Sequence, residues 1–275
     1  MTTTNLETAA ERAQWFAALH TPAAPLALAN AWDVASARLV EAAGAPAVAT
    51  TSAGVAWSLG SRDGNALARD RAVDLVARVA DAVRVPVSAD IESGFGADPA
   101  GVAETVSAVI AAGAVGINIE DGSREPAEHV ERLAAARAAA DAAGVPLYVN
   151  ARIDTYLFGL GEPGAPRLAE TLSRAAAYLE AGASGIFVPG VHEPEVVAEL
   201  ARGIDAPLNI LVGPGAPGVA KLGALGVARV SLGSWVAEAA YAVVRRATEE
   251  LLTKGTYDAV ADSLTYGDLN SLFGN

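Results

Sequence analysis

The feature that most constrains the fold of this chain is a pattern that recurs eight times. Short runs rich in Val, Ile, Leu and Ala end in a polar residue, and most give way to an Ala-rich stretch with helical spacing. The eight runs cover residues 26–30, 47–51, 86–90, 115–120, 147–152, 185–189, 208–212 and 228–232. Runs this continuously apolar are typical of parallel strands that are covered on both faces.

The stretches between the runs predict helices, most clearly over residues 97–112, 125–143 and 167–181. Eight strand–helix units in 275 residues match an α/β fold of the (β/α)8 or TIM-barrel type, whose usual size is about 250 residues. An open doubly wound sheet is the alternative. That fold normally has a glycine-rich turn after its first strand, whereas this chain has Asn30-Ala31-Trp32-Asp33 there. The barrel is therefore the favoured fold.

The chain shows no linker rich in Pro, Ser or charge, so we predict one barrel domain over residues 1–275. Residues 235–252 predict the eighth helix. Residues 255–275 form a helical tail that carries Leu264, Leu269, Leu272 and Phe273 with few charges. A tail this apolar has to cover something, either its own barrel or a neighbouring subunit.

Charge and cysteine content limit the partners and the chemistry. The 19 Lys and Arg against 32 Asp and Glu give a net charge of −13, which argues against binding nucleic acid or an anionic membrane. The absence of cysteine excludes disulfides, thiolate metal sites and a cysteine nucleophile. The first 14 residues lack a signal-peptide core, and no apolar stretch is long enough to span a bilayer. We expect a soluble, cytoplasmic protein.

Acidic residues gather where the predicted strands end, which is the active-site face of TIM barrels. Asp90 and Glu92 are two residues apart, so an extended segment would point both to one side. Glu120 ends the next strand, about 4.8 Å away. An all-oxygen set suits a hard cation, Mg²⁺ or Mn²⁺, and Arg152 on the following strand could bind a carboxylate in a bidentate fashion. A structural salt-bridge network of Asp90, Glu120 and Arg152 is the alternative.

A wider set of motifs resembles the isocitrate lyase/phosphoenolpyruvate mutase superfamily, over about residues 26–257. The motifs are TTSAG at 50–54, LGSRD at 59–63, DIESGFG at 90–96, GINIED at 116–121 and NARID at 150–154. The resemblance implies a Mg²⁺-dependent barrel that makes or breaks a C–C or P–C bond beside a small 2-oxo or 2-hydroxy acid, through a metal-stabilised enolate. It also implies a homo-oligomer, a dimer of dimers that exchanges C-terminal helices.

The same resemblance implies roles for individual residues. The metal shell, partly through water, would be Asp90, Glu92 and Glu120. Asp63 would lie in the polar site beside the metal, and Arg152 would hold the substrate carboxylate. Backbone N–H groups of the TTSAG segment would meet substrate oxygens; the residues concerned are Thr51, Ser52 and Ala53.

Position along the chain adds further candidates. His129 follows Glu125-Pro126 on a predicted helix and could move protons next to the site, with exposed helix surface as the alternative. Trp32 and Asn209 are candidate substrate-binding residues at the first and seventh strands. His192 is a weaker candidate base after the sixth strand, and His20, before the barrel, is expected on the surface.

The chain also departs from the superfamily pattern. Lyases of the superfamily carry a Cys-containing mobile loop, and this chain has no Cys and reads GSREP at 122–126. The loop Lys and Asn of the mutases are missing too, and the sixth strand, where citrate-type lyases place a Glu, reads Val188-Pro189-Gly190 in this chain. We expect a lyase for a small 2-oxo or 2-hydroxy dicarboxylate, with oxaloacetate-type decarboxylation its simplest version. The alternatives are phosphonate chemistry and a non-catalytic carboxylate-binding protein.

Overall fold

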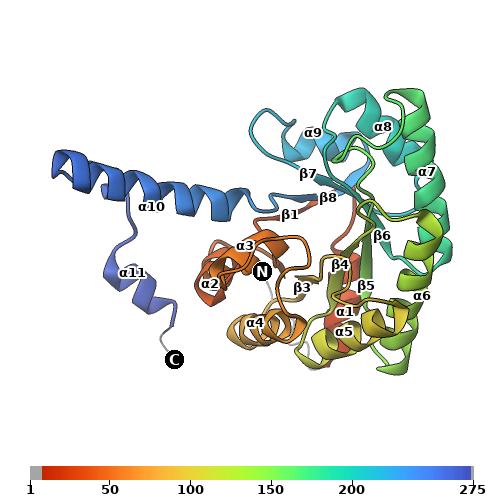
Figure 1. Ribbon diagram of the computed structural model, residues 1–275, viewed down its shortest axis with the longest axis horizontal. Helices are drawn as coiled ribbons and strands as arrows, with labels where there is room; N and C mark the ends of the chain where they lie inside the picture. Colours follow the sequence, from red (N-terminus) through yellow and green to blue (C-terminus); the bar gives the residue numbers. More distant parts are fainter. Residues whose placement is uncertain (1–7, 274–275) are drawn as a thin grey trace.

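The computed structural model describes residues 8–273, so the first seven residues and the last two residues of the predicted tail lie outside it. Eight parallel strands form a nearly closed barrel with helices around it (Figure 1). The strands are β1 Leu26–Leu28, β2 Val48–Ala49, β3 Val87–Asp90, β4 Gly116–Glu120, β5 Tyr148–Arg152, β6 Gly185–Val188, β7 Leu208–Leu211 and β8 Val227–Ser231. Their pairing order is β1-β8-β7-β6-β5-β4-β3-β2, which confirms the predicted TIM barrel.

The barrel closes between β1 and β2 by few contacts. A single bridge joins Ala31 to Thr50. Beside it, the amide nitrogen of Asn30 donates to the Thr50 carbonyl at 3.0 Å, and its amide oxygen accepts from the N–H of Gly233 at 2.9 Å. One asparagine therefore ties the ends of β1, β2 and β8 together at the rim where sites of such barrels lie.

The helices follow the strands in the predicted alternation. They are α1 Ala9–Ala18, α2 Val34–Ala42, α3 Ser52–Ser58, α4 Arg69–Ala82, α5 Pro99–Ala111, α6 Pro126–Ala142, α7 Ala165–Glu180, α8 Pro194–Gly203, α9 Val219–Ala224, α10 Trp235–Lys254, η1 Asp258–Val260 and α11 Tyr266–Ser271. α4 illustrates why these segments form helices against the barrel. Its buried residues are Ala72, Leu75, Val76 and Val79, and their spacing places them on one face of the helix. Along residues 8–273 no helix has both the length and the apolar character needed to cross a membrane.

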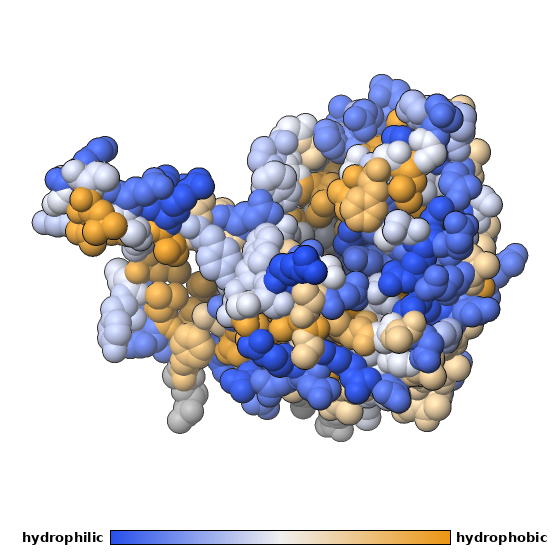
Figure 2. Space-filling model, in the orientation of Figure 1, coloured by the Kyte–Doolittle hydropathy of each residue, from blue (hydrophilic) through white to orange (hydrophobic). Residues whose placement is uncertain are grey.

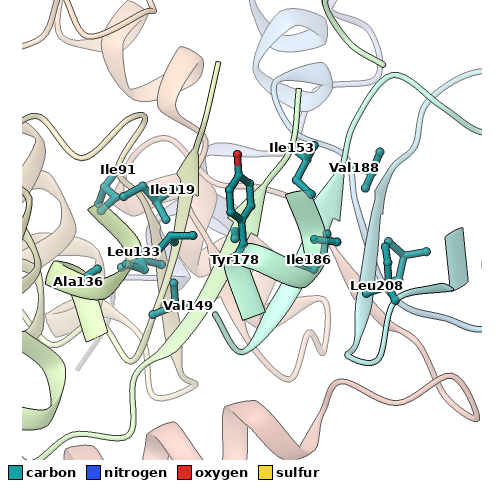
Figure 3. Close-up of a cluster of buried hydrophobic side chains, with 14 of the residues drawn as sticks. Ile91, Ile119, Leu133, Ala136, Val149, Ile153, Tyr178, Ile186, Val188 and Leu208 are labelled. Atoms are coloured by element: carbon teal, nitrogen blue, oxygen red, sulfur yellow. The ribbon is translucent and has the colours of Figure 1, made fainter. Parts of the chain in front are cut away.

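The apolar core lies between the outer face of the sheet and the helices. Ile119, Val149 and Ile186 of the strands pack towards Leu133 of α6 and Tyr178 of α7 (Figure 3). The inside of the barrel differs, because buried polar side chains occupy much of it. These are Ser88, Asn118, Asn150, Asn209, Arg229 and Ser231. Barrel interiors are usually filled with branched apolar residues, so this polar interior sets up the site above it.

The bottom of the barrel is closed by α1. Phe16 is 0% exposed and lies where an added Cβ on Gly116 would come within 2.5 Å of its ring. The expectation that His20 lies on the surface is wrong: it is 7% exposed and stacks on Tyr148, with ring centroids 3.9 Å apart. Burial lowers the pKa of His20 to about 3. The neutral ring therefore donates from Nδ1 to the Phe16 carbonyl at 2.9 Å.

The predicted eighth helix is confirmed as α10, but it projects from the barrel instead of covering it (Figure 1). Along α10 only Ala237 is buried. The tail returns towards α2, where Arg38 donates to the Leu272 carbonyl at 2.6 Å and lies 5.6 Å from the Phe273 ring centroid. Figure 2 shows apolar side chains on α10 and on the tail that follows it. Those exposed include Val243, Val244, Leu251, Leu252, Tyr257, Leu264 and Tyr266.

The place that a packed eighth helix would fill is an open apolar groove. It lies between α2 and α9 over the outer face of β1 and β8. Its lining includes Ala27, Leu39, Val212, Val219, Val230 and Leu232. The projecting helix and the open groove are thus two unsatisfied apolar surfaces of one chain.

Candidate active site

A small cavity of about 220 Å³ opens at the carboxyl ends of the strands. Its polar lining is Asn30, Thr51, Ser52, Asp63, Asp90, Asn118, Arg152, Ser231 and Ser234. Its apolar lining is Ala53, Leu157, Phe187, Pro189, Leu211, Leu232 and Trp235, with Gly233 at one edge. Arg152 is the one cationic side chain among these residues. The volume and the mixed lining suit one small acid with a few polar groups.

Six of the residues predicted from the sequence meet in this cavity. Asp90 and Arg152 come from the ends of β3 and β5, and Asp63 comes from the loop between α3 and α4. The other three are Thr51, Ser52 and Ala53 at the start of α3. The N–H of Thr51 does not take the predicted role, because it donates to the Ala31 carbonyl at 3.0 Å. The first N–H groups of a helix have no partner within the helix, so Ser52 and Ala53 are left to present donors to the cavity.

Trp32 and Asn209 do not line the cavity. Trp32 packs, partly buried, against the cluster of α2, α3 and α4, with its Cβ close to Gly54. Asn209 is 1% exposed and accepts a hydrogen bond from the Ser231 hydroxyl at 3.2 Å. It therefore lies one layer below the cavity floor. Ser231, Asn118 and Trp235 line the cavity instead. Ser231 ends β8, Asn118 lies two residues before the end of β4, and Trp235 begins α10, so of the three only Ser231 stands at a strand end.

His129 also lies away from the cavity. It is 0% exposed on the inner face of α6, so the alternative of an exposed helix surface is wrong. Its ring centroid is 4.7 Å from that of Tyr178, and neither ring nitrogen has a hydrogen-bond partner. Burial, with the charges of Arg124, Arg132 and Arg174, lowers the pKa of His129 to about 3. His129 is a neutral side chain between helix and sheet.

Glu92 departs from the extended geometry that the sequence suggested. β3 ends at Asp90, and Glu92 has a φ of 51°, which breaks the alternation of an extended strand. Asp90 lines the cavity and Glu92 does not. The Glu92 carboxylate accepts a hydrogen bond from the backbone N–H of Asn65, and Ser93 donates to the Asn65 side chain at 2.7 Å. Glu92 thereby fixes the loop that carries Asp63.

Arg152 is held from two sides. Its Nη1 lies 2.6 Å from Glu120 Oε2, its neighbour in register on β4, and its Nε donates to Asp154 Oδ1 at 2.7 Å. The Glu120–Arg152 pair of the salt-bridge alternative is thus present. Glu120 does not line the cavity. The guanidinium is oriented before any substrate arrives, which favours recognition of a carboxylate.

A buried network outside the barrel supports Arg152, and its members were missed at the sequence level. Asp121 Oδ1 accepts from the backbone N–H of Asp154 at 2.9 Å. Asp121 Oδ2 accepts from Tyr178 at 2.8 Å and from Arg174 at 2.9 Å. Asp121 directly follows β4 and Asp154 lies two residues after β5, both inside the quoted motifs, and that position was the available signal. Asp121 thus fixes the position of Asp154, and Asp154 in turn orients the guanidinium of Arg152.

The site holds more negative than positive charge. Burial raises the pKa of Glu92 to about 7 and of Glu120 to about 8, the latter against the opposing charge of Arg152. Burial also raises the pKa of Asp90, and the charge of Asp63 adds to this. Glu92 Oε1 is buried without a partner. Crowded carboxylates with an unpartnered oxygen fit a bound cation.

The spacing of the acidic side chains limits how a cation could be held here. In the described part of the chain, no three acidic or histidine side chains are grouped closely enough to hold a bare metal ion. Mg²⁺ usually keeps several waters and takes only one or two carboxylates directly. Asp90 is therefore the carboxylate that a hydrated hard cation in the cavity would meet, and Glu92 and Glu120 would be reached through water.

We predict that the metal-free protein loses stability as pH rises from about 4.5 to about 8. Across this window the unfolded chain loses the protons of Glu92 and Glu120 first, because their pKa is 4.5 there, whereas in the folded chain the pKa is about 7 for Glu92 and about 8 for Glu120. The folded state binds more protons, so deprotonation favours unfolding. Thermal unfolding in chelator checks this. Glu120→Gln should flatten the slope, and an unchanged slope in that variant would contradict the assignment.

The sequence of this chain is similar to that of known proteins. Residues 16–252 match the family model of phosphoenolpyruvate phosphomutase. An uncharacterized protein of Mycobacterium tuberculosis (strain ATCC 25618 / H37Rv) is 41% identical over 216 residues, 78% of this chain and 80% of that protein. The 2-methylisocitrate lyase of Escherichia coli (strain K12) is 32% identical over 208 residues, 70% of this chain and 67% of the lyase.

A solved structure agrees over nearly the whole chain. The crystal structure of a putative lyase/mutase from Burkholderia cenocepacia J2315 has a TM-score of 0.89 and 38% identity, and it covers 97% of each chain. The family match spans most of the barrel and all the strand ends that line the cavity. The chain belongs to the phosphoenolpyruvate phosphomutase family, within the isocitrate lyase/phosphoenolpyruvate mutase superfamily of lyases and mutases.

Proposed function

We propose that this enzyme is a Mg²⁺-dependent lyase that cleaves or forms a C–C bond beside the carboxylate of a small 2-oxo or 2-hydroxy dicarboxylic acid. The observation that carries the proposal is the joint placement of Arg152, Asp90 and the start of α3 on one cavity of about 220 Å³. A bound Mg²⁺ would supply positive charge against the oxygen on which negative charge develops. Mn²⁺ is the alternative ion.

The residues of this chain have separate tasks in the proposal. Arg152 binds the substrate carboxylate through its guanidinium fork. The N–H groups of Ser52 and Ala53 donate to substrate oxygens at the start of α3. Phe187 and Trp235 cover the carbon skeleton and exclude water from the reacting bond. Asp63 lies on an exposed loop at the cavity, so it is the acidic group best placed to exchange a proton with solvent.

A panel of small acids with and without Mg²⁺ tests the proposal: oxaloacetate, malate homologues, 2-methylisocitrate and phosphonopyruvate. We expect turnover of a C–C substrate with Mg²⁺, loss of turnover in chelator, and recovery with Mg²⁺ or Mn²⁺. Oxalate, a planar enolate mimic, should bind only when the metal is present. Equal oxalate binding in chelator would show that the metal role is wrong, and turnover of phosphonopyruvate alone would replace C–C with P–C chemistry.

We also propose that the chain forms a homo-oligomer, a dimer of dimers, in which α10 fills the groove between α2 and α9 of a neighbouring subunit. Two observations support this: the groove is apolar where an eighth helix would pack, and α10 exposes Val244 at 62% and Leu251 at 56%. Covering these surfaces removes apolar area from water, at about 25 cal/mol per Å².

We predict that the double variant Val244→Asp, Leu251→Asp forms a smaller assembly than the wild type, because two charges would have to be buried in the apolar groove. Light scattering coupled to size exclusion measures the mass, which for the wild type should be a multiple of 27.7 kDa. Thr253→Asp is the control, since Thr253 is exposed and, nine residues after Val244, lies on the opposite face of α10. A monomeric wild type would refute the assembly.

A further inference from the structure

The barrel interior contains a buried arginine to which the proposed chemistry assigns no task. Arg229 lies on β8 and is 0% exposed. Ser231, two residues further along the same strand, lines the cavity. Side chains two apart on a strand point to the same face, so Arg229 lies inside the barrel, directly below the cavity.

Arg229 spans the barrel. The pairing order places β8 and β4 on opposite sides, yet Nη2 of Arg229 donates to Asn118 Oδ1 on β4 at 3.3 Å. Its Nε donates to the Ser231 hydroxyl, also at 3.3 Å. Asn118 and Ser231 both line the cavity. One guanidinium therefore holds two polar side chains of the cavity floor, on opposite walls.

The contact with Asn118 fixes which way that amide points. Asn118 Oδ1 accepts from Arg229 and also from Asn150 Nδ2, at 2.9 Å. With the oxygen facing two donors, the nitrogen of the Asn118 amide is left to donate to Asp90. The chain of contacts from Arg229 thus ends on an acidic group of the cavity.

Packing alone does not account for an arginine here. No carboxylate among residues 8–273 forms an ion pair with Arg229, and its Nη1 has no hydrogen-bond partner. Burial lowers the pKa of Arg229 to about 10, so the group stays charged at neutral pH. A buried charge without a paired acid costs stability that an apolar residue of similar volume would avoid.

We propose that Arg229 is the positioning residue of the cavity floor, which holds Asn118 and Ser231 in place and sets a permanent positive charge below the bound anion. This inference rests on the proposed function, because it takes the cavity to bind a small carboxylate. A positive charge enclosed in a low-dielectric interior acts strongly over short distances. It would offset the negative charge of the acidic rim when the substrate adds its own.

The experiment compares oxalate binding by calorimetry, with Mg²⁺ present, and thermal unfolding in four proteins: wild type, Arg229→Met, Arg229→Lys and Arg137→Met. Arg137 is the matched control, because it is a partly buried arginine that donates to the carbonyls of Gly182 and Leu147, away from the cavity. Arg229→Met should weaken oxalate binding by about 100-fold, the scale of lost hydrogen bonds from a charged group. Its melting temperature should stay equal or rise.

The control variants distinguish a positioning role of Arg229 in ligand binding from a purely structural role. Arg137→Met should lower the melting temperature and leave oxalate affinity unchanged. Arg229→Lys keeps the charge but cannot span Asn118 and Ser231 with a fork, so we expect affinity to fall by about tenfold. If Arg229→Met does not fold, the oxalate affinity of Arg229→Lys is the test. Unchanged oxalate affinity in whichever of these two variants folds overturns the inference. A wild type that fails to bind oxalate overturns the proposed function and this inference with it.

Discussion

Arg152→Ala is expected to weaken oxalate binding by about 1,000-fold, the upper range for removing one partner of a buried charge pair. Arg152 is the one cationic side chain of the cavity lining. Its guanidinium is oriented by Glu120 and Asp154 before ligand arrives. The alanine variant would lose the carboxylate contact and leave both acids without their cation, so an incoming anion would meet uncompensated negative charge.

Calorimetric titration with oxalate and Mg²⁺ measures this loss. Arg78→Ala is the control: Arg78 pairs with Asp74 on the exposed surface of α4 and does not line the cavity, so the oxalate affinity of this variant should match that of the wild type. Arg152→Lys should recover only part of the binding, because an ammonium cannot form two parallel hydrogen bonds to a carboxylate. If Arg152→Ala binds oxalate as the wild type does, the carboxylate lies elsewhere in the cavity and the proposed orientation is wrong.

Asp121→Ala should lower the free energy of unfolding by about 3–5 kcal/mol, the cost of breaking a buried ion pair from one side. Asp121 is 0% exposed. It accepts from Arg174, from Tyr178 and from the backbone N–H of Asp154. Its loss would leave a charged and two neutral donors without their acceptor between α7 and the sheet.

Urea unfolding gives the free energy for this comparison. Glu170→Gln removes the other acidic partner of Arg174, which is solvent-exposed at 44%, so it should cost at most about 1 kcal/mol. Asp121→Asn keeps the size and one acceptor oxygen and should fall between the two. Equal stability of Asp121→Ala and Glu170→Gln would mean that the buried network contributes no more than a surface pair.

Much of the site was predictable because the barrel consists of eight similar strand–helix units, and each unit can be recognised from its own stretch of sequence. Each strand end can be read from an apolar run that stops at a polar residue, and parallel strands bring all these ends to one rim. Asp90 and Arg152 therefore met as predicted, as did the segment from Thr51 to Ala53. Asp121 and Asp154 sat in the same motifs but were overlooked, because a residue that supports another has no chemical signal of its own.

The sequence by itself determined the eight strand–helix units, the acidic rim and the family, because periodicity and short motifs depend on near neighbours along the chain. The tertiary structure alone decided that Glu92 turns away through a left-handed backbone, that His129 is buried and that α10 leaves the barrel. It also decided that Arg229 reaches Asn118, 111 residues away along the chain. The physical reason is that local spacing fixes which face a side chain occupies, whereas its partner across the barrel is fixed only when the sheet closes.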